Sequence, residues 1–290
     1  MPKPDLPEIL TAWSFQPLVL ASILAAGGLY LGSIRRIGRG RGNRWPGLRS
    51  ACFLGGLGAL AIALLSPVGA YADVFLWVHM VQHILITLLA APLLVLGAPV
   101  TLALRVTRPE VRRGLLRILR SLPSRVISHP ILAWLLFAAA LVGSHFSPLY
   151  QAALEDPTVH VLEHVLYLST ALLFWVPVVG LDPGRWKLAH PVRLLYLFLA
   201  APVNTAVALA IYSASGVLYP AYEAARTWGP SPLADQRLAG ALMWIVGDLI
   251  LLAAVILAAA AWLRHDRVLA SRLDARSNKD QAPAAGAGSG

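Results

Sequence analysis

Two histidine pairs with helical spacing stand out in the sequence. His79 and His83 lie in the stretch HMVQH, and His160 and His164 lie in HVLEH. Side chains four residues apart share one face of a helix, with Cβ atoms about 5–6 Å apart. Two imidazoles in this arrangement can chelate one metal ion, and imidazole suits copper, zinc and iron. The two pairs therefore predict a metal site with up to four nitrogen ligands.

Three other side chains are candidates for the same site. His145, in GSHFSPLY, offers a fifth imidazole. Met80 and Met243 are the internal methionines of the chain, and thioether sulfur favours Cu(I). Met80 lies about 100° round a helix from the histidine face, so we do not expect it to be a direct ligand. For both methionines, filling space in the core is at least as good an interpretation as metal binding.

Acidic and amide side chains are candidates for supporting roles, and three of them are predicted near the outer surface: Asp73, Glu163 and Asp235. Glu163 is adjacent to His164 and can orient an imidazole through a hydrogen bond. Asp235 can do the same from a loop, or pair with Arg237. Asn204 and Asp248 lie within apolar segments, and we expect them to hydrogen-bond each other across two helices.

The segments that hold these residues are predicted to cross a membrane. Of the 290 residues, 58% are hydrophobic and 13% charged, whereas a soluble domain carries about a quarter charged residues. The apolar residues form blocks of about twenty, the length that spans hydrocarbon as a helix. The predicted fold is an all-α, seven-transmembrane-helix bundle with spans at about 16–34, 49–67, 75–104, 130–149, 157–180, 191–213 and 238–263.

The remaining segments are short or polar. The expected organisation is an extracytoplasmic N-terminus (1–15), a transmembrane domain (16–263) and a cytoplasmic tail (264–290), disordered from about residue 277. The third span contains Pro92, Gly97 and Pro99, which predict a kink or an early helix end. Residues 109–120, PEVRRGLLRILR, are typical of an amphipathic helix on the membrane surface.

Basic residues predict the orientation of the bundle. They cluster after the first and third spans, around Arg185, and in the tail from Arg264. Such segments face the cytoplasm, so we expect the N-terminus outside and the C-terminus inside. The five candidate histidines then share one layer on the extracytoplasmic side. The net charge of +10 is explained by topology and contacts with anionic membrane lipids, and we expect no nucleic-acid partner. The single Cys52 excludes disulfides and CxxC motifs.

Four stretches of the sequence carry a family resemblance: HMVQHILITLLAAPLLVLGAP, HFSPLYQAALEDPTVHVLEHVLYLSTALLFWVPVVG, HPVRLLYLFLA and WGPSPLADQRLAGALMW. They resemble the multi-pass CtaG family of cytochrome c oxidase assembly factors, in order and with similar spacing. The resemblance implies a non-enzymatic protein of the bacterial plasma membrane that helps copper reach the oxidase. The implied partners are cytochrome c oxidase subunits and a periplasmic copper donor. The implied ligands are His79, His83, His145, His160 and His164, with Asp235 and Met243 less specifically indicated.

Other functions remain open from the residues themselves. HVLEH at 160–164 matches HxxEH, in which two histidines bind zinc and a glutamate acts as general base, as in a membrane-embedded zinc hydrolase. Histidines on two helices at equal depth can also clamp a haem, as in an electron-transfer protein. A scaffold for oxidase subunits would need no metal. Copper is the expected metal, with zinc or haem as alternatives.

Overall fold

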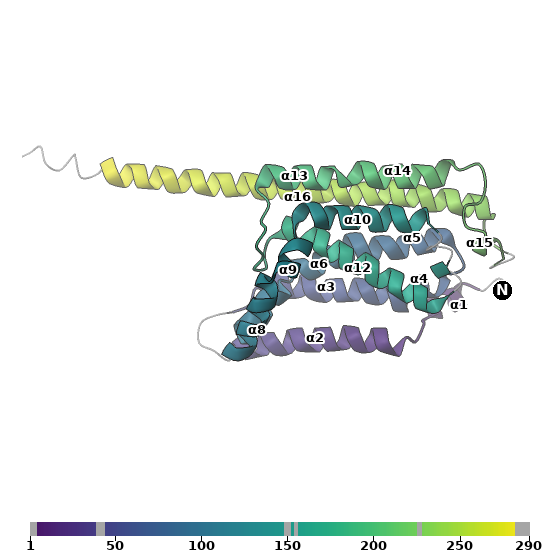
Figure 1. Ribbon diagram of the computed structural model, residues 1–290, viewed down its shortest axis with the longest axis horizontal. Coiled ribbons are helices and arrows are strands. Elements are labelled where there is room, and N and C mark those ends of the chain that lie inside the picture. Colours follow the sequence, from purple (N-terminus) through teal and green to yellow (C-terminus); the bar gives the residue numbers. More distant parts are fainter. Residues whose placement is uncertain (1–4, 39–43, 148–151, 154–155, 225–227, 282–290) are drawn as a thin grey trace, which may run out of the picture.

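The computed structural model shows a bundle of helices that run side by side (Figure 1). The structure describes residues 5–38, 44–147, 152–153, 156–224 and 228–281, and contains no strand within them. Six helical segments are long and apolar enough to cross a membrane: Pro17–Gly38, Gly47–Tyr71, Leu76–Val106, Pro157–Val179, His190–Ser213 and Pro232–Asp274. The predicted all-helical, multi-pass class is confirmed to this extent.

The seventh predicted span corresponds to a shorter apolar helix. Pro130–His145 has 16 residues and is about 24 Å long, against the roughly 30 Å thickness of a hydrocarbon core. Residues 148–151, which belong to the end of the predicted fourth span and its loop, lie outside the described residues. The described residues therefore contain seven apolar helical segments, six of them with the length of a span.

The elements are as follows, in chain order: α1 (Leu6–Thr11), α2 (Pro17–Gly38), α3 (Gly47–Leu65), α4 (Pro67–Tyr71), α5 (Leu76–Ile84), η1 (Leu85–Ala90), α6 (Ala91–Leu96), α7 (Pro99–Val106), α8 (Pro109–Arg120), α9 (Leu122–Ile127), α10 (Pro130–His145), α12 (Pro157–Val179), α13 (His190–Phe198), α14 (Ala200–Ser213), α15 (Ala221–Ala224) and α16 (Pro232–Gln281). Within the bundle α10 packs on α12, α16 packs along α14 and α5, and α3 packs on η1 and α6.

The third membrane segment is interrupted twice. The predicted break is confirmed, because α6 ends at Leu96 and Ala98 adopts the left-handed conformation (φ 48°) before α7 begins. Gly97 sits against α3, where an added Cβ would lie 2.6 Å from the Cβ of Phe53. The π-helical stretch η1, directly after His83, was not predicted. Such π-helical turns occur frequently at functional sites.

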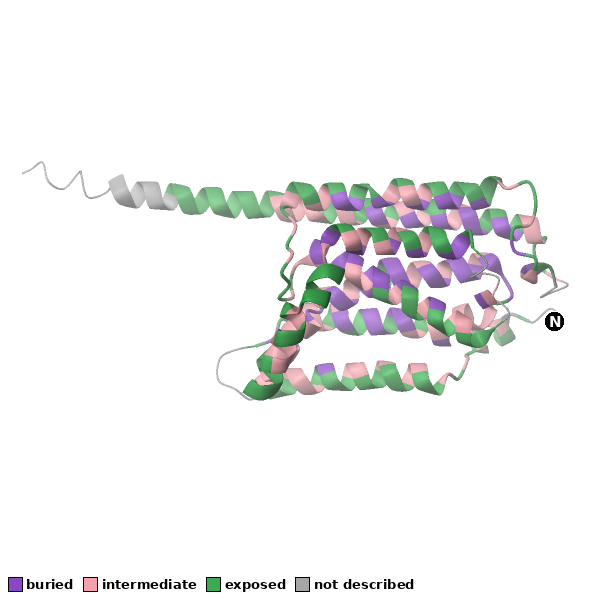
Figure 2. Ribbon diagram, in the orientation of Figure 1, coloured by how far each residue is buried: buried purple, intermediate pink, exposed green. Residues whose placement is uncertain are grey.

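The last helix is longer than the sequence pattern predicts. α16 has 50 residues, about 75 Å, and its C-terminal part projects beyond the bundle (Figure 1), where residues 263–274 are exposed (Figure 2). Residues 277–281, expected to be disordered, are helical, because the polar run before Pro283 contains no glycine or proline to end the helix. Residues 282–290 lie outside the described residues.

The two ends of the bundle differ in character. The predicted amphipathic helix is present with the expected bounds as α8, which has no buried residue and lies across the end opposite the N-terminus (Figure 1). The other end carries α1, α4 and α15, and there α5 and α12 begin and α10 ends. The arginine-rich segments and the candidate histidines are therefore separated along the bundle axis.

The pair α14 and α16 positions one wall of the candidate site. A Cβ on Gly240 would lie 2.8 Å from the α14 backbone, and one on Gly247 would lie 2.8 Å from Nδ2 of Asn204. Asn204 Nδ2 donates to Asp248 Oδ1 (2.9 Å), which confirms the predicted contact, and to the carbonyl of Met243 (3.0 Å). These contacts fix α16 at the level of Met243.

Candidate metal centre

The first histidine pair is brought together on α5. Nε2 of His79 and Nε2 of His83 lie 2.8 Å apart, and both side chains are buried. The start of α5 is anchored to α16 by Asp235, whose carboxylate accepts hydrogen bonds from the backbone amides of Leu76 and Trp77 (3.1 Å each). Asp235 was expected to orient an imidazole or to pair with Arg237, and these contacts show that it caps the start of the helix that carries the pair.

The hydrogen bonds of His79 set its tautomer. The hydroxyl of Tyr222 donates to the carbonyl of Ala72 (3.0 Å) and lies 3.2 Å from Nδ1 of His79. Because the hydroxyl proton is used on Ala72, Nδ1 of His79 is the donor to the tyrosine oxygen. The lone pair of neutral His79 is then on Nε2, which faces His83. A second contact that fixes the tautomer in this way is typical of metal-binding histidines.

Glu163 from α12 completes a group of three. Its Oε2 lies 3.8 Å from Nε2 of His79, and one ligand atom from each of His79, His83 and Glu163 lies within 4.8 Å of the others. Glu163 is 1% exposed, and neither carboxylate oxygen has a hydrogen-bond partner among the described residues. A buried, unpartnered carboxylate is costly unless it is neutralised or meets a cation. The donor set therefore fits a metal ion.

The structure places Glu163 against an imidazole of another helix. Glu163 was expected to support an imidazole of the site, and its Oε2 faces His79 on α5. Adjacent residues of a helix point about 100° apart, so Glu163 and His164 present different atoms to the cluster. The HxxEH stretch thus contributes its glutamate to a group of ligands drawn from two helices.

The second histidine pair lies against the first. The ring centroids of His160 and His79 are 5.4 Å apart, and those of His164 and His83 are 6.3 Å apart. His164 Nε2 donates to Oε1 of Gln82 (3.1 Å), and Gln82 is itself held by the carbonyl of Ala63 (2.9 Å). This assigns the lone pair of neutral His164 to Nδ1.

The outer edge of the cluster carries a solvent-exposed acid. Nδ1 of His160 lies 3.4 Å from Oδ1 of Asp73, while its Nε2 has no hydrogen-bond partner among the described residues. At the start of α12, Asp156 caps the helix through the amide of Thr158 (2.7 Å), and this backbone hydrogen bond holds the pKa of Asp156 below its usual value. The cap fixes the first turns of α12, from which His160 projects.

His145 joins the cluster from α10. Its Nδ1 lies 2.7 Å from the carbonyl of Leu141, which can only accept, so Nδ1 carries the proton and Nε2 the lone pair. Tyr167 lies 3.2 Å from the same nitrogen, and its hydroxyl also contacts Ser144. The centroids of His145 and His83 are 6.2 Å apart. All five predicted histidines therefore form one connected cluster.

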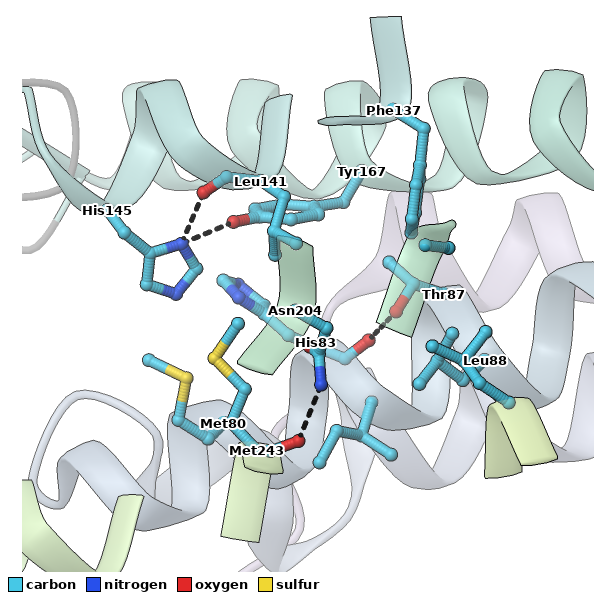
Figure 3. Close-up of a pocket in the computed structure, with 13 residues that line it drawn as sticks. Met80, His83, Thr87, Leu88, Phe137, Leu141, His145, Tyr167, Asn204 and Met243 are labelled. Atoms are coloured by element: carbon cyan, nitrogen blue, oxygen red, sulfur yellow. Dashed lines mark hydrogen bonds between the residues drawn. The ribbon is translucent and has the colours of Figure 1, made fainter. Parts of the chain in front are cut away.

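A small cavity lies on the inner side of His83. Its volume is about 30 Å³, and its wall includes His83, His145, Met80 and Met243 (Figure 3). The two methionines are 1% and 4% exposed. Met80 was expected to lie off the histidine face, and it lines this cavity together with Met243.

The comparison with protein families identifies the family of this chain. The family model for the cytochrome c oxidase caa3 assembly factor matches residues 28–265. The chain belongs to this CtaG family. This membership confirms the resemblance seen in the sequence.

The curated relatives of this CtaG-family chain are longer proteins. Uncharacterized proteins of Mycobacterium bovis and Mycobacterium tuberculosis are each 32% identical over 290 residues, which is 96% of this chain and 43% of theirs. An uncharacterized protein of Mycobacterium leprae is 28% identical over 288 residues, 96% of this chain and 44% of its own. The chain thus spans less than half the length of these relatives. No solved structure matches it.

Several residues of the CtaG-family site were not predicted from the sequence. They are the polar partners that fix the imidazoles: Gln82, Ser144, Tyr167 and Tyr222. Gln82 lies inside the stretch HMVQH, and a polar side chain within a buried histidine motif could have indicated a partner for an imidazole. The two tyrosines lie in ordinary apolar or loop sequence, where nothing local marks them.

Proposed function

We propose that this protein binds copper at the histidine cluster and supports the metallation of cytochrome c oxidase. The observation that carries the proposal is Glu163, a buried carboxylate without a hydrogen-bond partner among the described residues, placed against His79 and His83. A cation between these ligand atoms would neutralise the carboxylate and use the lone pair that Tyr222 directs to Nε2 of His79. His145, His160 and His164 surround this group and can complete or exchange its ligands.

Copper is favoured over the other metals by the surroundings of the site. Imidazole suits several ions, but the thioethers of Met80 and Met243, next to His83, favour Cu(I). Family membership points the same way, because cytochrome c oxidase is a copper enzyme. The proposed role is non-catalytic, with copper as cargo that is received and passed on.

The proposed setting is the bacterial plasma membrane, with the histidine end of the bundle facing outward. The arginine-rich segments gather at the opposite end, as expected for a cytoplasmic face. Copper would then arrive from a periplasmic donor and leave towards oxidase subunits. Anionic lipids would contact α8 and the neighbouring basic loops.

A complementation experiment tests this function. In a strain that lacks the gene, His83→Ala is expected to give the low oxidase activity and oxidase copper content of the deletion, with a normal amount of the protein in the membrane. The matched control is His190→Ala/His265→Ala, a histidine pair at the arginine-rich end with ring centroids 5.1 Å apart. The control should restore the oxidase. Normal oxidase copper content with His83→Ala would contradict the proposal and favour a metal-free scaffold.

A further inference from the structure

The two internal methionines of the chain come from segments more than 160 residues apart and meet at one cavity. Met80 lies on α5 and Met243 on α16, and both line the same space of about 30 Å³ (Figure 3). A cavity of this size accommodates a single water molecule or ion. The backbone of Met243 is fixed by Asn204, which also lines the cavity. The thioethers are therefore held at a defined place in the bundle.

The donors around this cavity differ from those around Glu163. Its polar wall includes the imidazoles of His83 and His145 and the two thioethers, while Glu163 and His79 do not line it. Much of the remaining wall is apolar, including Leu88 and Phe137. The other polar lining residues already have hydrogen-bond partners within the protein: Thr87, Tyr167 and Asn204. Sulfur and imidazole without a carboxylate form a soft, uncharged donor set, which favours a monovalent soft ion over a hard divalent one.

His83 belongs to both groups. Its Nε2 faces Nε2 of His79 at 2.8 Å, and its ring also lines the cavity. Nδ1 of His83 is buried and has no hydrogen-bond partner among the described residues. Because a neutral imidazole has a single lone pair, His83 can serve either set of ligands, one at a time.

We infer that the protein has two adjacent copper positions that share His83. The carboxylate position consists of His79, His83 and Glu163. The thioether position consists of Met80, Met243 and His145 with His83, and it is selective for Cu(I). This inference rests on the proposed function and adds to it that the two positions differ in the oxidation state of the copper they bind. The thioether position excludes Cu(II) and Zn(II).

Silver provides the test, because Ag(I) is a redox-stable substitute for Cu(I) with the same preference for sulfur. Detergent-purified protein is titrated with Ag(I) and, separately, with Zn(II) as a probe of the carboxylate position. Met80→Leu/Met243→Leu removes both sulfur atoms at nearly constant volume. The double variant is expected to bind Ag(I) at least about tenfold more weakly, by analogy with the loss of other metal-site contacts, and Zn(II) as tightly as the parent. Ile84→Leu, another change in the cavity wall, serves as the control for repacking and should keep the parent affinity for Ag(I).

X-ray absorption of the silver- or Cu(I)-loaded parent gives a second, independent result. Sulfur is expected among the nearest neighbours of the ion in the parent and not in the methionine variant. Unchanged Ag(I) affinity in the variant, or an ion without sulfur neighbours in the parent, overturns the thioether position. If copper is still lost from His79→Ala/His83→Ala in that case, the proposed function stands without it. A parent that binds neither Ag(I) nor Zn(II) overturns both.

Discussion

Glu163→Gln is expected to weaken copper binding by at least about tenfold, since it removes the one carboxylate of the group. A change that also removes the polar group should stabilise the metal-free protein. In the parent the buried carboxyl group has no hydrogen-bond partner among the described residues, and burying an unpartnered polar group is costly. Glu163→Leu should therefore weaken copper binding as much as Glu163→Gln does, and should raise the free energy of unfolding of the metal-free form by about 1–3 kcal/mol.

The opposite signs of these two effects separate a metal ligand from an ordinary core residue. Thermal unfolding with and without copper measures both, because an ion that binds only the folded state raises its stability by about 2.7 kcal/mol at 100 times the dissociation constant. Glu110→Gln, an exposed carboxylate on α8, is the control and should change neither quantity. A metal-free Glu163→Leu protein that unfolds more easily than the parent would show that the carboxylate stabilises the fold by itself.

His83→Ala is expected to be the most damaging single histidine change in direct binding assays. It removes a ligand from the carboxylate position and from the thioether position, so affinity for Zn(II) and for Ag(I) should each fall by at least about tenfold. His79→Ala should weaken Zn(II) and leave Ag(I) nearly unchanged, because His79 does not line the cavity.

Isothermal titration of the two single variants with each ion tests this pattern. If His79→Ala lowers the affinities for Zn(II) and Ag(I) by the same factor, the cluster is one undivided site. Binding of both ions at parent strength in His83→Ala would remove this residue from the centre of the site.

The layer of histidines was predictable from the sequence, but its internal pairing was not. The position of a residue within an apolar span gives its depth along the bundle axis, and this depth is similar for His79, His83 and His160. It does not give the rotation of each helix about its axis. That rotation decides that Glu163 faces His79 and that Met80 faces Met243. Between two different helices, the Asn204–Asp248 contact was predictable as a pair, because polar side chains inside a membrane need a partner.

Contacts from irregular segments were the least predictable part of the site. Tyr222 lies in the short helix α15 and reaches His79, 143 residues away in the chain. Asp235 caps α5 from a distance of 159 residues. A capping residue usually directly precedes the helix it caps, so local sequence patterns cannot reveal a capping acid that comes from another helix.

The helical continuation of α16 was not predicted, because a change from apolar to polar residues does not by itself end a helix.

The most direct measurement is the copper bound per chain in detergent-purified, copper-loaded protein, compared with His79→Ala/His83→Ala and with the control His190→Ala/His265→Ala. The account predicts copper that survives desalting in the parent and in the control, and its loss from the His79/His83 variant with the fold retained. Equal copper in all three proteins, or none in the parent after loading, would contradict a copper centre at the histidine cluster.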